Sequence, residues 1–300
     1  MGITVVAGFV QGVTMSAYAD EKPHLTLGRI TQEPGKNIDR LTAMAQYLDA
    51  KLSSDSISSV QIAIVDSREK MAEMLRNGEI DLFSETPLMA LDLMEQGLAE
   101  PLVREWKNGA AEYHSVIVVR RDSGLRSLED LRGRKFAFED PGSTSGYLLP
   151  RAALEDAGLP LEELTDPRNI PTDGKLGYSF AMGEINVVAW VNRGLADAGA
   201  ISNLDWDNPK KAPARLKDSL TVIHETPPVI RSMMMVRRTL DPEIKDRLAS
   251  VLTQMHETSD GQTALNAYFK VSRYDPLNGQ ATTGLENARK VWRQPWNQNE

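Results

Sequence analysis

Residues 138–147 read Phe-Glu-Asp-Pro-Gly-Ser-Thr-Ser-Gly-Tyr and are the most informative stretch of the chain. The stretch is typical of a strand, a tight Asp-Pro-Gly turn and the start of a helix. A helix N-terminus exposes N–H groups with about half a positive charge, and Ser143, Thr144 and Ser145 place three hydroxyls beside them. Such a turn can bind a phosphate-like oxyanion without Lys or Arg. It can equally be a plain helix cap, which needs one serine.

Two catalytic loops are excluded at this stretch. A nucleophile elbow, Gly-x-Ser-x-Gly, needs a central serine, where this chain has Thr144. The stretch also lacks the Gly-Lys-Ser/Thr ending of a P-loop, and no Gly-x-Gly-x-x-Gly follows a predicted strand. We therefore interpret the turn as a binding site or a cap.

Strands and helices alternate outward from this turn. Apolar residues at helical spacing, capping residues and runs of Val and Ile define the elements. Because strand and helix alternate, the fold class is α/β, with mainly parallel sheets. The main predicted strands are 24–30, 60–65, 81–84, 113–120, 135–139 and 196–201. The helices are 38–52, Ser67 to Gly78, a helix ending at Ala157 and 184–193, and residues 158–180 are predicted to be irregular.

The order of these elements predicts two lobes. The chain leaves the first lobe near Tyr113 and returns to it near Thr226. Lobe 1 is therefore predicted to comprise residues 20–114 and 227–300, and lobe 2 residues 115–226. Two crossings make a hinge, and the cleft between two hinged lobes is a common position for a ligand.

Composition narrows the partners and the chemistry. The 300 residues carry 34 Lys and Arg against 42 Asp and Glu, and the net charge of −8 argues against nucleic acid and anionic lipid. Cysteine is absent, which excludes disulfides, thiolate catalysis and Cys-ligated metals. The four histidines show no metal-ligand spacing. We expect no cofactor, no metal, no nucleic-acid partner and a monomeric protein.

The first nineteen residues differ from the rest. An apolar run at residues 3–13 is followed by Ala17 and Ala19, two apart and just before a polar break. This is the pattern of a secretory signal peptide, although no Lys or Arg precedes the apolar run. The alternative is a buried N-terminal strand. We predict that residues 1–19 are a signal peptide and that the protein is periplasmic.

Together with Ser-Leu-Glu-Asp-Leu-Arg-Gly at 127–133 and Gly-Leu-Ala-Asp-Ala-Gly-Ala at 194–200, the turn resembles the phosphonate-binding branch of periplasmic solute-binding proteins. The resemblance covers about residues 24 to 270. It implies a two-lobed type II periplasmic binding fold with a hinge and a central cleft that closes on a small oxyanion. It also implies that Ser143, Thr144 and Ser145 hold the phosphoryl-like oxygens.

The chain departs from this family at two places in the expected cleft. The family's Gly-Pro-x-x-Tyr turn is replaced by residues 84–89, which present Glu85 and Thr86, and a family histidine is represented by Glu184. Two acids near an anion repel it unless the ligand carries protons or a cationic group. Glu85 and Glu184 are therefore candidates for contacts with ligand OH or amine groups. Alternatively, Glu184 is a first-turn helix acid and Glu85 forms an ion pair at the lobe edge.

Two further residues are candidates for the cleft. Tyr113 leads the crossing strand and can reach the cleft, with core packing as the alternative. Asn203 follows the strand predicted at 196–201 and is a weaker candidate.

The leading hypothesis is a periplasmic binding protein that captures a phosphonate, phosphite, phosphate or related oxyanion for an ABC transporter. The alternative keeps the same site and reports an oxyanion such as arsenate to a membrane sensor kinase. A two-lobed α/β enzyme is the least favoured hypothesis, because no nucleophile accompanies Glu85 and Glu184.

Overall fold

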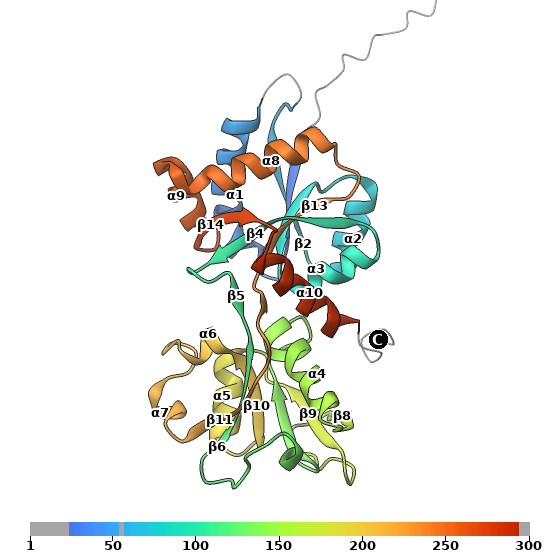
Figure 1. Cartoon of the computed structure of the whole chain (residues 1–300), viewed down its shortest axis with the longest axis vertical. Helices are drawn as coiled ribbons and strands as arrows, with labels where there is room; N and C mark the ends of the chain where they lie inside the picture. The colour runs from blue at the N-terminus through green and yellow to red at the C-terminus, as the bar shows by residue number, and fades with distance from the viewer. Residues whose placement is uncertain (1–23, 54–56, 294–300) are drawn as a thin grey trace, which may run out of the picture.

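The structure is a computed structural model that describes residues 24–53 and 57–293. These residues form two α/β lobes joined at a narrow waist, each built on a six-stranded sheet (Figure 1). The predicted signal segment, residues 1–19, lies outside the described residues. None of the helices in the described part of the chain is both long and apolar enough to cross a membrane.

The first lobe contains the N-terminal and C-terminal parts of the described chain. Its strand order is β14-β4-β13-β3-β1-β2, with β1, β2 and β3 parallel and β13 antiparallel to β3 and β4. Helices α1, α8 and α9 cover one face of this sheet, and α2, α3 and α10 cover the other. The elements are β1 (Leu25–Ile30), α1 (Pro34–Leu52), β2 (Val60–Val65), α2 (Arg68–Asn77), β3 (Leu82–Glu85), α3 (Pro87–Glu95), β4 (Ala99–Lys107), β13 (Met233–Arg237), α8 (Pro242–Gln254), α9 (Ser259–Ala267), β14 (Val271–Pro276) and α10 (Gln280–Trp292).

The second lobe is built from the middle of the chain. Its strand order is β11-β6-β10-β7-β9-β8, with helix α4 against one face and α5 against the other. The elements are β6 (Ser115–Arg120), η1 (Glu129–Leu131), β7 (Lys135–Phe138), η2 (Thr144–Leu148), α4 (Leu149–Asp156), β8 (Leu161–Glu163), β9 (Leu176–Phe180), α5 (Glu184–Asn192), β10 (Ala198–Ser202), α6 (Asn203–Trp206), α7 (Ala214–Lys217) and β11 (Leu220–Glu225).

Two crossing segments and one helix connect the lobes. The short strands β5 (Glu112–Tyr113) and β12 (Val229–Ile230) pair antiparallel at the waist. Just below them, the Ser115 N–H donates to the Thr226 hydroxyl, and the Thr226 N–H donates to the Ser115 carbonyl. Helix α10 contacts β12, α3 of the first lobe and α4 of the second, so the C-terminal helix braces the hinge (Figure 1).

The prediction of an irregular segment at residues 158–180 is wrong. Residues 158–180 hold two strands, β8 and β9, and β9 pairs parallel with β7 inside the sheet. In β9 the large residues Leu176, Tyr178 and Phe180 alternate with Gly177 and Ser179, which dilutes the apolar signal. A Cβ at Gly177 would lie 2.7 Å from the Leu164 side chain, so close packing accounts for this glycine within a strand.

Candidate ligand site between the lobes

The Ser-Thr-Ser turn lies at the start of η2, as the sequence predicts, and its first serine is a helix cap. The Ser143 Oγ accepts from the Gly146 N–H at 2.9 Å and donates to the Glu139 carboxylate at 2.7 Å. A Cβ at Gly146 would lie 2.4 Å from the Glu139 Cβ, so glycine is needed there. The Ser143 hydroxyl is therefore engaged within the protein.

The other two hydroxyls of the turn lie deep between the lobes. The Thr144 Oγ1 accepts from the backbone N–H of Leu88, in the first turn of α3, at 3.0 Å, and this bond joins the two lobes. Ser145 is buried, and the Tyr113 phenol lies against the hydroxyls of Thr144 and Ser145. Burial raises the pKa of Tyr113, so its phenol stays a neutral hydrogen-bond donor.

Across the waist, Glu85 ends β3 and is buried. Its Oε1 lies 3.8 Å from the Arg29 Nη1, and its Oε2 accepts from the Thr86 N–H at 3.3 Å. Burial raises the pKa of Glu85, although Arg29 opposes the shift. Thr86 precedes α3 and makes no side-chain cap bond. Glu85 therefore lies beside a cationic partner, as expected from the alternative in which Glu85 forms an ion pair instead of contacting the ligand.

Glu184 and Asn203 are also engaged by neighbouring groups. The Lys211 Nζ lies 2.9 Å from the Glu184 carboxylate and, against the effect of burial, lowers the pKa of Glu184. Burial and the neighbouring Glu184 charge raise the pKa of Glu139 to about 8. The Asn203 Oδ1 accepts from the His114 N–H at 3.0 Å, which fastens the crossing strand to lobe 2.

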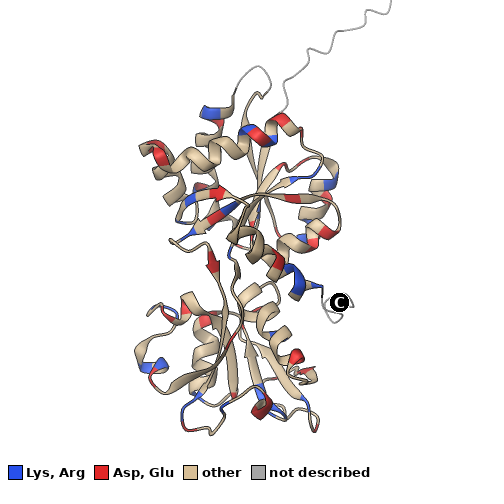
Figure 2. Cartoon of the chain, viewed as in Figure 1, with Lys and Arg blue, Asp and Glu red and all other residues tan. Residues whose placement is uncertain are grey.

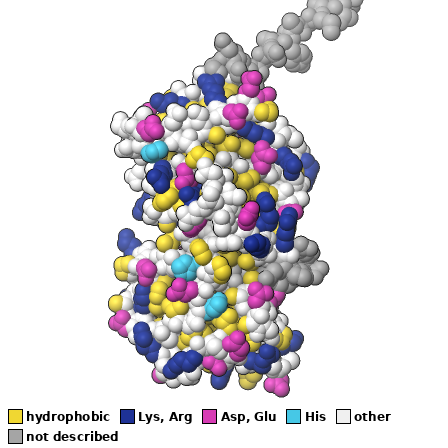
Figure 3. Space-filling model, viewed as in Figure 1, with side chains coloured by type: hydrophobic (Ala, Val, Ile, Leu, Met, Phe, Trp, Pro, Cys, Tyr) yellow, Lys and Arg dark blue, Asp and Glu magenta, His cyan; other side chains and the backbone are white. Residues whose placement is uncertain are grey.

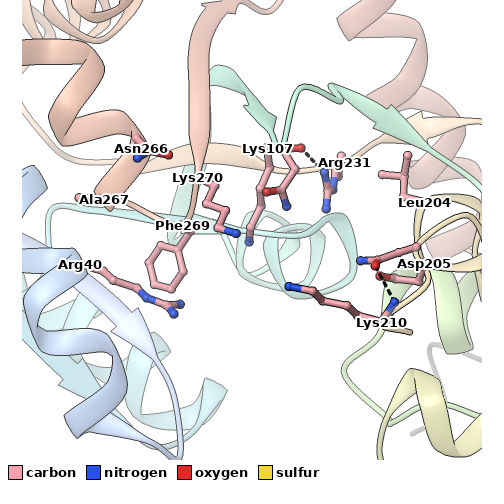
Figure 4. A pocket seen from close by; sticks show the side chains of 12 residues that line it. Arg40, Lys107, Leu204, Asp205, Lys210, Arg231, Asn266, Ala267, Phe269 and Lys270 are labelled. Carbon is pink, nitrogen blue, oxygen red and sulfur yellow. Dashed lines mark hydrogen bonds between the residues drawn. The ribbon is translucent and has the colours of Figure 1, made fainter. Parts of the chain in front are cut away.

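A cavity of about 760 Å³ opens between the lobes beside these residues (Figure 4). None of the eight residues predicted from sequence lines it. Its wall contains five cationic side chains and one carboxylate, Asp205, together with Phe269 and three asparagines. The cations point into the same space from both lobes: Arg40, Lys107, Arg231 and Lys270 from the first, and Lys210 from the second.

These five cations converge on one cavity without an ion-pair partner among the residues that the structure describes. Over the described ranges 24–53 and 57–293, none of the five has a carboxylate oxygen within 4 Å, whereas Arg104, Arg237 and Lys211 each have one within 3 Å. Burial lowers the pKa of Lys107 and of Arg231. Basic and acidic side chains are otherwise interspersed over both lobes (Figures 2 and 3). The cavity is therefore a local concentration of uncompensated positive charge.

Sequence reasoning missed this cluster because its members come from separate segments. Arg40 lies on α1, Lys107 ends β4, Lys210 follows α6, Arg231 follows β12, and Lys270 precedes β14. No local spacing connects them, and the net charge of −8 points away from a basic site.

A family model identifies the family of this chain. Residues 29–282 match the model of the ABC transporter, phosphonate, periplasmic substrate-binding protein family. The chain is 25% identical over 256 residues to the phosphate-import protein PhnD of Mycolicibacterium smegmatis, covering 84% of this chain and 74% of the relative.

Solved structures give the same fold. XAC2383 from Xanthomonas citri, solved bound to chloride, has a TM-score of 0.84 and 33% identity, covering 90% of this chain and 97% of that one. The same protein solved bound to ATP has a TM-score of 0.83 and the same identity and coverage. PhnD1 from Prochlorococcus marinus, in complex with methylphosphonate, has a TM-score of 0.62 at 20% identity, covering 91% and 98%.

The two-lobed type II periplasmic binding fold is therefore confirmed, and the family is one of transport binding proteins rather than enzymes. With the match extending over residues 29–282, this chain belongs to the periplasmic phosphonate substrate-binding proteins of ABC transporters.

Proposed function

We propose that this protein captures a phosphonate, phosphite, phosphate or related oxyanion in the cavity between its lobes and delivers it to an ABC transporter from the periplasm. The observation that carries the proposal is the set of five cations without a carboxylate partner around one interlobe cavity. Lys107 and Arg231 are half-buried, and a charge removed from water without a counter-charge is costly, so a bound anion stabilises the cavity it enters. The relatives' names point the same way, since phosphate, methylphosphonate, chloride and ATP are all anions.

In this proposal, Lys107 and Arg231 are the principal anion-binding residues. Both are half-buried, and the Arg231 guanidinium donates to the Lys107 backbone carbonyl, which orients Arg231 beside Lys107. Tyr113 connects them to the predicted turn, because it lies against Ser145 and near the Arg231 guanidinium. Tyr113 and Ser145 are the predicted residues that we place at the ligand.

The other predicted residues have supporting roles in this proposal. Thr144 holds the lobes together through Leu88, and Ser143 caps η2. Glu85 balances Arg29, with Thr86 donating to it, and Asn203 fastens the crossing strand. Glu184 neutralises the charge of Lys211 through an ion pair.

A thermal-shift screen of residues 20–300 tests the proposal. The anions are phosphate, phosphite, methylphosphonate, 2-aminoethylphosphonate and arsenate, with choline as a cationic control. A ligand at 100 times its Kd adds about 2.7 kcal/mol, which raises Tm by a few degrees at this size. We expect at least one oxyanion to stabilise the protein and choline to have no effect. Stabilisation by none of the anions would refute the proposal.

A further inference from the structure

The interlobe cavity is larger and more strongly charged than one small oxyanion requires. Its volume of about 760 Å³ lies within the roughly 300–1,000 Å³ typical of sites for drug-sized ligands. A phosphonate or phosphate has a single phosphorus and at most two negative charges near neutral pH. Five cations face this space against the one carboxylate of Asp205.

The cations are arranged in two tiers. Lys107 and Arg231 are half-buried at the waist, and Arg40, Lys210 and Lys270 are exposed around the opening. One phosphoryl group at the inner pair would leave the outer three without a counter-charge. A second and third group joined to the first would extend toward the outer tier.

Several cationic side chains lie around the ring of Phe269. The Arg29 Cζ lies 4.6 Å, the Arg40 Cζ 5.1 Å and the Lys107 Nζ 5.4 Å from the centre of its ring. The π face of an aromatic ring attracts cations, so the ring offsets part of their mutual repulsion. Since cations occupy the surroundings of this ring, Phe269 concentrates positive charge at the wall of the cavity.

The backbone at Phe269 and Lys270, on this side of the cavity, is strained. Phe269 and Lys270 have φ values of 53° and 57°, in the left-handed region that non-glycine residues seldom occupy, whereas Asn108, at 50°, belongs to an Asn-Gly turn that favours this conformation. Over residues 24–53 and 57–293, only one other non-glycine residue, Met182, has a positive φ. The Asn108 N–H donates to the Lys270 carbonyl at 2.9 Å, which joins the two turns. Such strain clusters at ligand sites, where it fixes side chains that a relaxed backbone would direct elsewhere.

We propose that the ligand is an oligophosphate, with two or more linked phosphoryl groups and at least three negative charges, either free or esterified to an organic group. This inference rests on the proposed function, because it takes the cavity as the anion site. Lys107 and Arg231 bind one phosphoryl group, and Arg40, Lys210 and Lys270 bind the next. Because Lys210 belongs to lobe 2, a long anion connects the lobes across the cavity.

Isothermal titration calorimetry of residues 20–300 tests the inference. The probes are methylphosphonate, phosphate, pyrophosphate, tripolyphosphate and a nucleoside triphosphate, at about 150 mM salt without divalent cations, and citrate is the non-phosphate polyanion. We expect at least one triphosphate to bind 100-fold or more tightly than methylphosphonate and phosphate, with pyrophosphate between them and citrate weaker than the triphosphates. Tighter binding of tripolyphosphate indicates a free oligophosphate, and tighter binding of the nucleoside triphosphate indicates an ester.

A double substitution in the outer tier, Arg40→Gln with Lys270→Gln, locates the extra affinity. Both side chains are exposed, and the Tm of the variant without ligand checks that it folds. We expect the affinity for the tighter triphosphate to fall at least tenfold, several times more than the affinity for methylphosphonate. Lys36→Gln removes an exposed cation from the same helix as Arg40, outside the cavity wall, and is expected to change neither.

Two results overturn the inference and leave the proposed function standing. In one, methylphosphonate or phosphate binds as tightly as both triphosphates. In the other, the double substitution lowers the affinities for all phosphorus-containing probes by the same factor. Failure of every probe to bind instead contradicts the proposed function itself.

Discussion

The Ser-Thr-Ser turn and the basic cavity lie side by side at the waist, and both have the chemistry to bind an anion. In the turn, the Ser143 and Thr144 hydroxyls are engaged with Glu139, Gly146 and Leu88. In the cavity, the cationic groups have no carboxylate within ion-pair distance in the part of the chain that the structure describes. The hydrogen-bonding groups of the turn are therefore largely paired within the protein, whereas the cations of the cavity have no anionic partner among its described residues.

This difference separates polar groups that build the fold from polar groups available to a ligand. A hydroxyl that already donates and accepts gains little from an anion, because a new bond must replace an existing one. A half-buried cation without a partner gains a full charge-assisted hydrogen bond. We therefore infer that the cavity supplies most of the affinity for the anion. The turn contributes mainly to the stability of the fold.

The largest expected effect comes from the inner cations. Lys107→Gln combined with Arg231→Gln removes two charge-assisted contacts and should weaken binding of the best oxyanion about 100-fold or more. Isothermal titration calorimetry gives the Kd of the variant and of the native protein. The Tm without ligand checks folding, because Arg231 also donates to the Lys107 carbonyl. A folded variant that binds within threefold of the native protein would move the site out of the cavity.

A smaller effect, on stability, is expected at the turn. Gly146→Ala places a methyl group against Glu139, where the native spacing leaves 2.4 Å, and overpacking of this kind costs about 1–3 kcal/mol. Gly142→Ala is the matched control, because its Cβ would contact only the Asp140 carboxylate at 3.3 Å. Urea denaturation measures both variants. Equal stability for the two would show that the turn is looser than its hydrogen bonds indicate.

The next prediction concerns pH. Burial and Glu184 raise the pKa of Glu139 to about 8 from 4.5, so the folded state binds more protons than the unfolded state between these values. The stability contributed by this carboxyl is present below pH 4.5 and is lost as pH rises toward 8. Glu139→Gln keeps an acceptor for Ser143 and removes the titration. The stability of this variant relative to the native protein should therefore increase from pH 5 to pH 8.

Urea denaturation of the native protein and the Glu139→Gln variant at pH 5, 6, 7 and 8 measures this difference. A difference that stays constant over the series would mean that Glu139 titrates near its ordinary value.

The smallest effect is expected for Ser143→Ala. Loss of the cap should cost about 1 kcal/mol of stability, and the Kd for the anion should change less than threefold. Urea denaturation and calorimetry on the same preparation give both values. A tenfold loss of affinity with unchanged stability would show that Ser143 binds the ligand. The turn, rather than the cavity alone, would then supply anion affinity.

The sequence predicts the fold better than the site, for physical reasons. Strands and helices are set by local apolar spacing and caps; Ser67, for example, accepts from the Lys70 N–H, and Gly78, at φ 75°, ends α2. The turn is equally local, so its position at the start of η2 is predictable. The failure at β9 has a local cause as well, since Gly177 and Ser179 interrupt its apolar residues.

The cavity has no such local signature. Arg40 and Lys270 are 230 positions apart in the numbering, and only the folded chain brings them to one space. The left-handed conformation of Phe269 and Lys270 is invisible in residue types that usually avoid it. Whether a cation has a carboxylate partner is likewise a property of the folded chain, and so is the convergence of five such cations on one cavity.

The most direct test of this account is a crystal structure of the protein with methylphosphonate, or with whichever oxyanion stabilises it most. The account predicts phosphonate oxygens within about 4 Å of the Lys107 Nζ and the Arg231 guanidinium, inside the interlobe cavity. An anion bound only at residues 143–145, with Lys107 and Arg231 making no contact to it, would contradict the account.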